Sequence, residues 1–146
     1  MRDADNIEAL ARRLRRLLGI DGQLRPDMIT VIFKLKNAGL IKNYLRVPDA
    51  EMAGSEAYFD PKTRLLHISE NTFCAANDGS YRSTTERRRA RYSIAHEIGH
   101  VALGHTEIRH RGESNEFRKL AKGNRQDERE AEQFAAAFLA PSHLVG

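Results

Sequence analysis

The sequence predicts one small α+β domain in which helices pack on a short, mainly antiparallel sheet. Its 146 residues are the length of a single domain, and 40% of them are hydrophobic, which is enough for a modest core. Apolar residues recur at helical spacing near both ends of the chain, whereas the middle holds short strand-like runs bounded by a turn. We see no internal repeat and no second domain in this pattern.

Charge and cysteine content narrow the classes of protein. The 24 Lys and Arg against 20 Asp and Glu leave a net charge of +4, less than a dedicated nucleic-acid-binding domain usually carries. The single cysteine, Cys74, excludes an internal disulfide framework. No apolar run approaches the ~18 residues of a membrane-spanning helix, and the N-terminus has no hydrophobic signal stretch. We therefore expect a cytoplasmic protein that binds neither a membrane nor, directly, nucleic acid.

The first 40 residues predict two helices. From Ile7 onward apolar residues recur at helical spacing, with arginines mostly on the other side, until Gly19 ends the helix. Pro26 opens a second helix that ends near Gly39. The run 29–33 is β-branched, so a strand remains an alternative there.

The middle of the chain predicts strands. A short strand over 41–47 precedes a proline, and a hairpin follows with strands over 57–59 and 64–68. Pro61 lies where the second position of a type I turn favours proline. The stretch 75–85 is polar and rich in Gly, Ser and Asn, which predicts a loop that begins just after Cys74, itself expected in a polar loop. Two further helices are predicted beyond it, from residue 86 to about 103 and from 126 to 139.

The third helix carries a recognisable chemical motif. His96, Glu97 and His100 form H-E-x-x-H, in which the two histidines lie one turn apart and can share one tetrahedral Zn²⁺. Glu97 lies beside that face, where its carboxylate can reach a metal-bound water without being a ligand. Ile94 and Ile98 belong to an apolar stripe on the opposite side, so the helix is expected to pack by one face and present the histidines by the other. The alternative is two ordinary surface histidines on a charged helix.

A peptidase zinc needs a third protein ligand and an open fourth position. His105 is nearest in sequence, but on a helical wheel it lies roughly 160° from the direction of His96 and His100. Glu128, at the start of the fourth helix, is the better candidate because a carboxylate beside a core face needs a partner such as a zinc ion. The alternative for Glu128 is a solvated acidic residue that favours the helix dipole.

Two more glutamates follow on the fourth helix. Glu132 lies one turn after Glu128, and we expect its side chain to hydrogen-bond one of the zinc ligands. Glu130 points roughly 160° away from Glu128 on the wheel and is predicted to be solvated.

Two blocks of sequence together resemble a known family. The first is R-Y-S-I-A-H-E-I-G-H over 91–100, and the second is E-x-x-A-x-x-F-A-A-x-x-L-x-P over 128–141. This pair resembles the ImmA/IrrE family of zinc metallopeptidases. The resemblance implies a zincin-like fold, with His96, His100 and Glu128 as the zinc ligands and Glu97 as the catalytic base. Residue 132, often Asn or Asp in this family, is Glu here.

The resemblance also implies an activity and a partner. Several family members cleave a helix-turn-helix repressor, whereas others are thought to regulate transcription. We therefore expect a zinc-dependent endopeptidase acting on a helix-turn-helix transcription regulator, with strand 64–68 as the sheet edge that pairs with the substrate. The alternative is a zinc-containing regulatory module that binds such a regulator without cleaving it. Glu97 favours the enzyme, because a pure binding module has no need of a general base.

One domain is expected over 1–146. Its N-terminal helices would occupy about 1–40 and its catalytic core about 55–142. The chain stops soon after Pro141, where relatives commonly continue, so we expect a truncated or unusually short family member.

Overall fold

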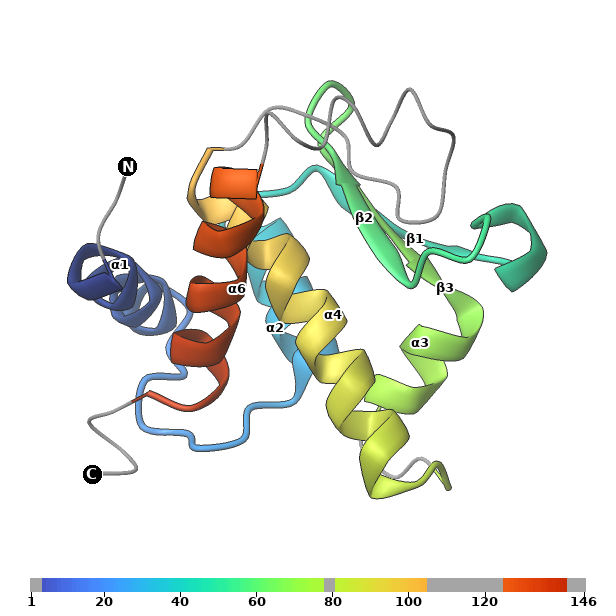
Figure 1. Cartoon of the computed structure of the whole chain (residues 1–146), viewed down its shortest axis with the longest axis horizontal. Helices are drawn as coiled ribbons and strands as arrows, with labels where there is room; N and C mark the ends of the chain where they lie inside the picture. The colour runs from blue at the N-terminus through green and yellow to red at the C-terminus, as the bar shows by residue number, and fades with distance from the viewer. Residues whose placement is uncertain (1–3, 78–80, 105–124, 142–146) are drawn as a thin grey trace.

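The computed structural model describes residues 4–77, 81–104 and 125–141, and it confirms the α+β class (Figure 1). Two helices precede a small sheet, and further helices follow it. In chain order the elements are α1 (Ala4–Leu17), α2 (Met28–Asn37), β1 (Asn43–Val47), a 3₁₀ turn (Asp49–Glu51), β2 (Ala57–Asp60), β3 (Leu65–Ser69), α3 (Glu70–Ala76), α4 (Thr84–Ala102) and α6 (Arg125–Leu139).

The sheet is mixed rather than mainly antiparallel. β2 and β3 form the predicted hairpin, in which Tyr58 pairs with His67, but β1 joins β3 in parallel, with Tyr44 opposite Leu66. The strand order is therefore β1-β3-β2, and β3 lies in the centre. The prediction that strand 64–68 forms a sheet edge for the substrate is wrong. This strand, β3, lies between β2 and β1, so a neighbouring strand already pairs with each of its sides.

The N-terminal helices form as predicted. The Asp27 side chain caps α2 by accepting from the backbone N–H of Ile29 and from the Thr30 hydroxyl. The β-branched run 29–33 is helical in α2, which excludes the strand alternative. Ile29, Val31 and Ile32 are buried in the core, whereas Phe33 is exposed. Gly39 follows with a positive φ of 77°, a conformation that ends the helix at little cost for a glycine.

The segment predicted as a polar loop around Cys74 is instead helical at its start. Ser69 caps α3, since its hydroxyl accepts from the Thr72 N–H, and the helix continues through Cys74 to Ala76. Phe73 and Ala76 are buried, so this short helix packs against the rest of the molecule. The apolar run from Phe73 to Ala76 belongs to this helix, but it is too short to predict a helix from the sequence.

Helix α4 runs through the middle of the molecule (Figure 1). It packs against β2 and α3 on one side and against α6 on the other, and α1 in turn covers α6. The core lies between these layers, where Ile32, Ile68, Ile98 and Phe134 are fully buried. No helix within the described ranges is long and apolar enough to cross a bilayer.

Arg15 departs from the predicted pattern of α1. Its arginines were expected to lie mostly away from the core, yet the Arg15 side chain is fully buried. Its guanidinium donates to the backbone carbonyls of Phe138 (2.6 Å), Ile20 (3.0 Å) and Gln23. Burial lowers the pKa of Arg15, and the Asp21 carboxylate opposes that shift. A single side chain thus links α1, the segment that follows it and the last turn of α6, whose end carbonyls lack partners within the helix.

Arg15→Met should destabilise the fold by about 2–4 kcal/mol, because the carbonyls that Arg15 satisfies would remain buried without donors. Arg16→Met is the matched control, since the Arg16 side chain is 58% exposed, and it should change stability by no more than about 0.5 kcal/mol. Urea unfolding followed by circular dichroism measures both. Equal stability of the two variants would show that Arg15 does not hold α6 to α1.

Candidate metal centre

Helix α4 supplies two histidines and a glutamate from its buried half. Ser83 caps the helix by accepting from the Glu86 N–H, and the following turns are exposed and rich in arginine. From Ile94 onward the helix enters the core, and His96, Glu97 and His100 are all buried. The motif therefore lies where the helix is covered on both sides.

Helix α6 supplies Glu128 from its first turn. The helix buries Ala131, Phe134, Ala135 and Phe138, and at 100° per residue Glu128 lies about 70° from the middle of this face. That position places its half-buried side chain at the boundary between the core and the α4 surface. The interpretation of Glu128 as a solvated acidic residue is therefore not supported.

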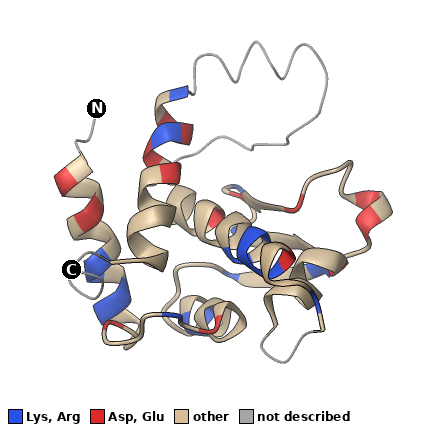
Figure 2. Ribbon diagram, turned by 60° about the horizontal axis from the view of Figure 1, so that its bottom comes forward, with Lys and Arg blue, Asp and Glu red and all other residues tan. Residues whose placement is uncertain are grey.

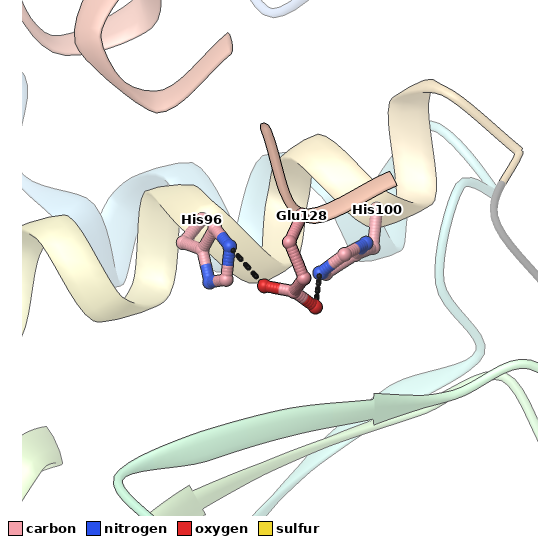
Figure 3. A group of neighbouring side chains, drawn as sticks. All are labelled: His96, His100 and Glu128. Carbon is pink, nitrogen blue, oxygen red and sulfur yellow. Dashed lines mark ion pairs between the residues drawn. The ribbon is translucent and has the colours of Figure 1, made fainter. Parts of the chain in front are cut away.

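The three side chains converge on one point (Figure 3). One Glu128 oxygen lies 3.0 Å from His96 Nε2, and the other lies 3.3 Å from His100 Nε2. One ligand atom from each residue lies within 4.8 Å of the other two, a group that could hold a metal ion. The structure thus brings together the three residues that the sequence suggested as ligands.

The electrostatics of this group favour a cation. Burial alone raises the pKa of Glu128, but the contacts and charge of His100 and His96 outweigh it and hold that pKa well below its usual range. Glu128 is therefore an anion that faces two ring nitrogens inside the protein. Two imidazoles and one carboxylate are a ligand set of catalytic zinc, which leaves a fourth position open. The residues present fit a Zn²⁺ ion.

Glu97 is held beside the ligands without joining them. Its Oε1 accepts a 2.8 Å hydrogen bond from the backbone N–H of Phe59 in β2, and its Oε2 lies 3.5 Å from His96 Nδ1. A buried carboxylate needs such partners. The edge strand of the sheet therefore fixes the carboxylate next to the three-residue group.

The burial of the other two glutamates of α6 is the reverse of what the sequence predicts. Glu132 is exposed, about 110° from the middle of the buried face, and the structure shows no hydrogen bond from it to His96 or His100. Glu130, predicted to be solvated, is buried and accepts from the Gln126 side chain at 3.2 Å. α6 packs against both α4 and α1, so its buried face is wider than one partner helix would make it, and a helical wheel of α6 alone does not predict that width.

Residues that the motif did not identify also adjoin the site. The Tyr92 ring lies one turn before His96 and nearly parallel to its imidazole, with centroids 6.1 Å apart. Ser93 donates to Glu56, which also pairs with Arg89 at 2.5 Å, so the start of β2 is tied to α4. No sequence signal links Glu56 to α4, because that contact depends on how the sheet docks. His105 lies outside the described residues.

Gly99 allows α4 and α6 to approach closely. A Cβ at this position would lie 3.1 Å from the Ala131 carbonyl oxygen and 3.3 Å from the Phe134 Cβ. Both atoms belong to the middle of α6, about one to two turns after Glu128. The glycine between the two histidines of the motif thus sets the distance at which Glu128 meets them.

Residues 81–145 match the Peptidase_M78 family model, described as the IrrE N-terminal-like domain. The matched segment contains both α4 and α6, and therefore the whole His96–His100–Glu128 group. This match confirms the resemblance to the ImmA/IrrE family over that segment and indicates a metallopeptidase-like function. Comparisons with curated proteins and with solved structures gave no match.

Gly99→Ala should weaken zinc binding, because the added methyl group must push α6, and Glu128 with it, away from α4. Overpacking of this kind typically costs about 1–3 kcal/mol, more than the ~1 kcal/mol that alanine gains over glycine in a helix. Gly22→Ala is the control, since open space surrounds Gly22. Zinc titration against a competing chelator measures the affinity of both variants. Unchanged affinity in Gly99→Ala would show that Glu128 does not depend on this contact.

Glu128→Ala should remove most of the zinc that the purified chain carries, because one of three ligands is lost. Glu132→Ala should leave zinc content unchanged, since that exposed side chain lies one turn beyond on the same helix. Elemental analysis of both proteins after dialysis gives the comparison. Full zinc occupancy in Glu128→Ala, or loss of zinc in Glu132→Ala, would contradict the ligand set.

Proposed function

We propose that this protein is a zinc-dependent endopeptidase in which His96, His100 and Glu128 hold the metal and Glu97 is the general base. The observation that carries the proposal is the convergence of the three ligand atoms, all within 4.8 Å of one another. The position of Glu97 beside them supports it further, because this buried carboxylate contacts the group without belonging to it. The family match over 81–145 agrees with a peptidase.

The residues divide the chemistry between them. Zn²⁺ bound by the three ligands would polarise the scissile carbonyl and lower the pKa of the attacking water. Glu97 accepts the proton of that water and delivers it to the amine of the leaving peptide. The Phe59 N–H holds one Glu97 oxygen, which keeps the carboxylate oriented toward the ligand group. Preorganisation of this kind limits the motion that the base needs during the reaction.

Strand β2 is the edge that would pair with an extended substrate. Backbone groups along an antiparallel strand point alternately toward and away from the neighbouring strand. The Glu56 carbonyl, just before β2, accepts from the Ser69 N–H of β3, whereas the Phe59 N–H points away from β3, to Glu97. β2 is an outer strand of the sheet and packs next to α4, whereas β3 has a strand on each side. A peptide that adds to β2 would therefore lie next to the general base.

We propose a helix-turn-helix transcription regulator as the substrate. The support is the resemblance to the ImmA/IrrE family, in which several members cleave such repressors. A protein substrate also suits a site that borders a strand edge, since backbone hydrogen bonds to β2 would bind the peptide without regard to its side chains. The alternative function is a zinc-containing regulatory module that binds the regulator without cleaving it. The burial and fixed orientation of Glu97 favour the enzyme.

Glu97→Gln should retain zinc and fold, because its amide oxygen can still accept from the Phe59 N–H. The amide cannot take a proton from water, so hydrolysis should fall by at least the ~10²-fold that is typical of losing a general base. The assay incubates each protein with a helix-turn-helix regulator encoded beside its gene and follows cleavage by mass spectrometry.

The outcomes separate the two functions. Cleavage by the original chain together with binding alone by Glu97→Gln supports the peptidase. If neither protein cleaves the regulator but both relieve repression equally, the regulatory module is the better description. Loss of zinc from Glu97→Gln would show that Glu97 is a ligand.

A further inference from the structure

The described chain contains an apolar groove that none of the His96–His100–Glu128 side chains lines. Helices α1 and α2 and the last turn of α4 form it, and Arg13 is its one charged lining residue within the described chain. The apolar lining residues are Leu10, Leu14, Leu17, Leu35, Leu40, Val101 and Ala102. Val101 directly follows the ligand residue His100, so the groove adjoins the end of the metal-binding helix.

Among the residues that the structure describes, the groove is accessible, although the surface of the protein is highly charged. Leu17 is 65% exposed, although 30% of all residues are charged and could have occupied its place. Leu10, Leu40, Val101 and Ala102 are only partly buried. A contiguous apolar concavity on such a surface is typical of an interaction site.

The size of the groove favours side chains of another protein over a small ligand. Its volume is about 190 Å³, below the roughly 300–1,000 Å³ of most small-molecule pockets. Leucines of α1 and α2, together with Leu40, form its walls. The apolar ridge of a helix can pack into such a groove, as the ridges of one helix pack into the grooves of another in protein cores. Apolar residues one turn apart on such a helix would fill it.

Charge around the groove determines which helix it favours. Arg13 lies in the groove and forms no ion pair within the described residues, and Lys34 and Lys36 flank the lining residue Leu35. The acidic residues of α1 lie toward its N-terminal end, whereas basic residues dominate its C-terminal half (Figure 2). A second copy of this chain would place like charges together, which disfavours self-association.

We propose that this groove binds an amphipathic helix of a partner protein, with an apolar stripe flanked by Asp and Glu. The stripe would pack on Leu17 and the neighbouring leucines, and the acidic flanks would face Arg13 and the α2 lysines. This inference concerns a second binding surface and does not depend on the proposed peptidase activity. The groove lies against α1 and α2, whereas the ligand group lies between α4 and α6.

The test uses a fluorescent peptide of about 18 residues, with Leu at helical i, i+3, i+4 and i+7 spacing and Glu on both flanks. An isomer of the same composition with its leucines spread around the helix serves as the peptide control. The protein variants are Leu17→Gln in the groove and Leu24→Gln outside it, because Leu24 is also exposed, at 45%. Arg13→Gln tests the charge. Fluorescence anisotropy at two salt concentrations gives each affinity.

The amphipathic peptide should bind saturably and the isomer should not. Leu17→Gln should weaken binding about tenfold, Leu24→Gln should leave it within about twofold, and Arg13→Gln should reduce both affinity and its salt dependence. The proposal is overturned if the isomer binds equally, if Leu24→Gln has the same effect as Leu17→Gln, or if no binding occurs. A dimer in sedimentation that Leu17→Gln disrupts would also overturn it, because a second copy would then occupy the groove.

Discussion

The close approach of α4 and α6 at Gly99 is the constraint on which the site depends. A Cβ at residue 99 would lie only 3.1 Å from the Ala131 carbonyl oxygen, so the backbones of the two helices approach closely at this point. This contact brings Glu128 within 3.0–3.3 Å of the two histidine nitrogens from the neighbouring helix. Helix packing, more than any loop, therefore determines the geometry of the ligand group, and rigid elements hold functional groups more accurately than loops do.

The position of α6 is in turn fixed from its far end. Arg15 of α1 binds the carbonyl of Phe138, and the last turns of α6 bury their phenylalanines against the core. On the other side, Phe59 of β2 holds Glu97, and Glu56, directly before β2, ties the strand to Ser93 of α4. The site thus depends on elements from both halves of the chain. Val101 and Ala102, directly after His100 in α4, line the apolar groove, so a partner bound there would contact the end of α4.

Most helices and strands could be predicted from the sequence because caps, turns and apolar periodicity depend on residues close together in the chain. Helix α2 begins at the cap that Asp27 provides, the hairpin forms around Pro61, and the spacing of His96 and His100 follows from helical geometry alone. What failed depends on long-range packing. The parallel pairing of β1 placed the expected edge strand in the centre, the burial of Arg15 depends on carbonyls of α6, and the exchange between Glu130 and Glu132 depends on the second partner of α6. A helical wheel represents a single helix, so it does not show how many other elements pack against that helix or how wide its buried face is.

We propose that His96, His100 and Glu128 form one metal site between α4 and α6. Diffraction from crystals of the zinc-loaded protein, recorded above and below the zinc absorption edge, locates the metal. We expect one strong anomalous peak bounded by His96 Nε2, His100 Nε2 and the Glu128 carboxylate. A peak bounded by other residues, or no peak between these three side chains in zinc-saturated crystals, would contradict it.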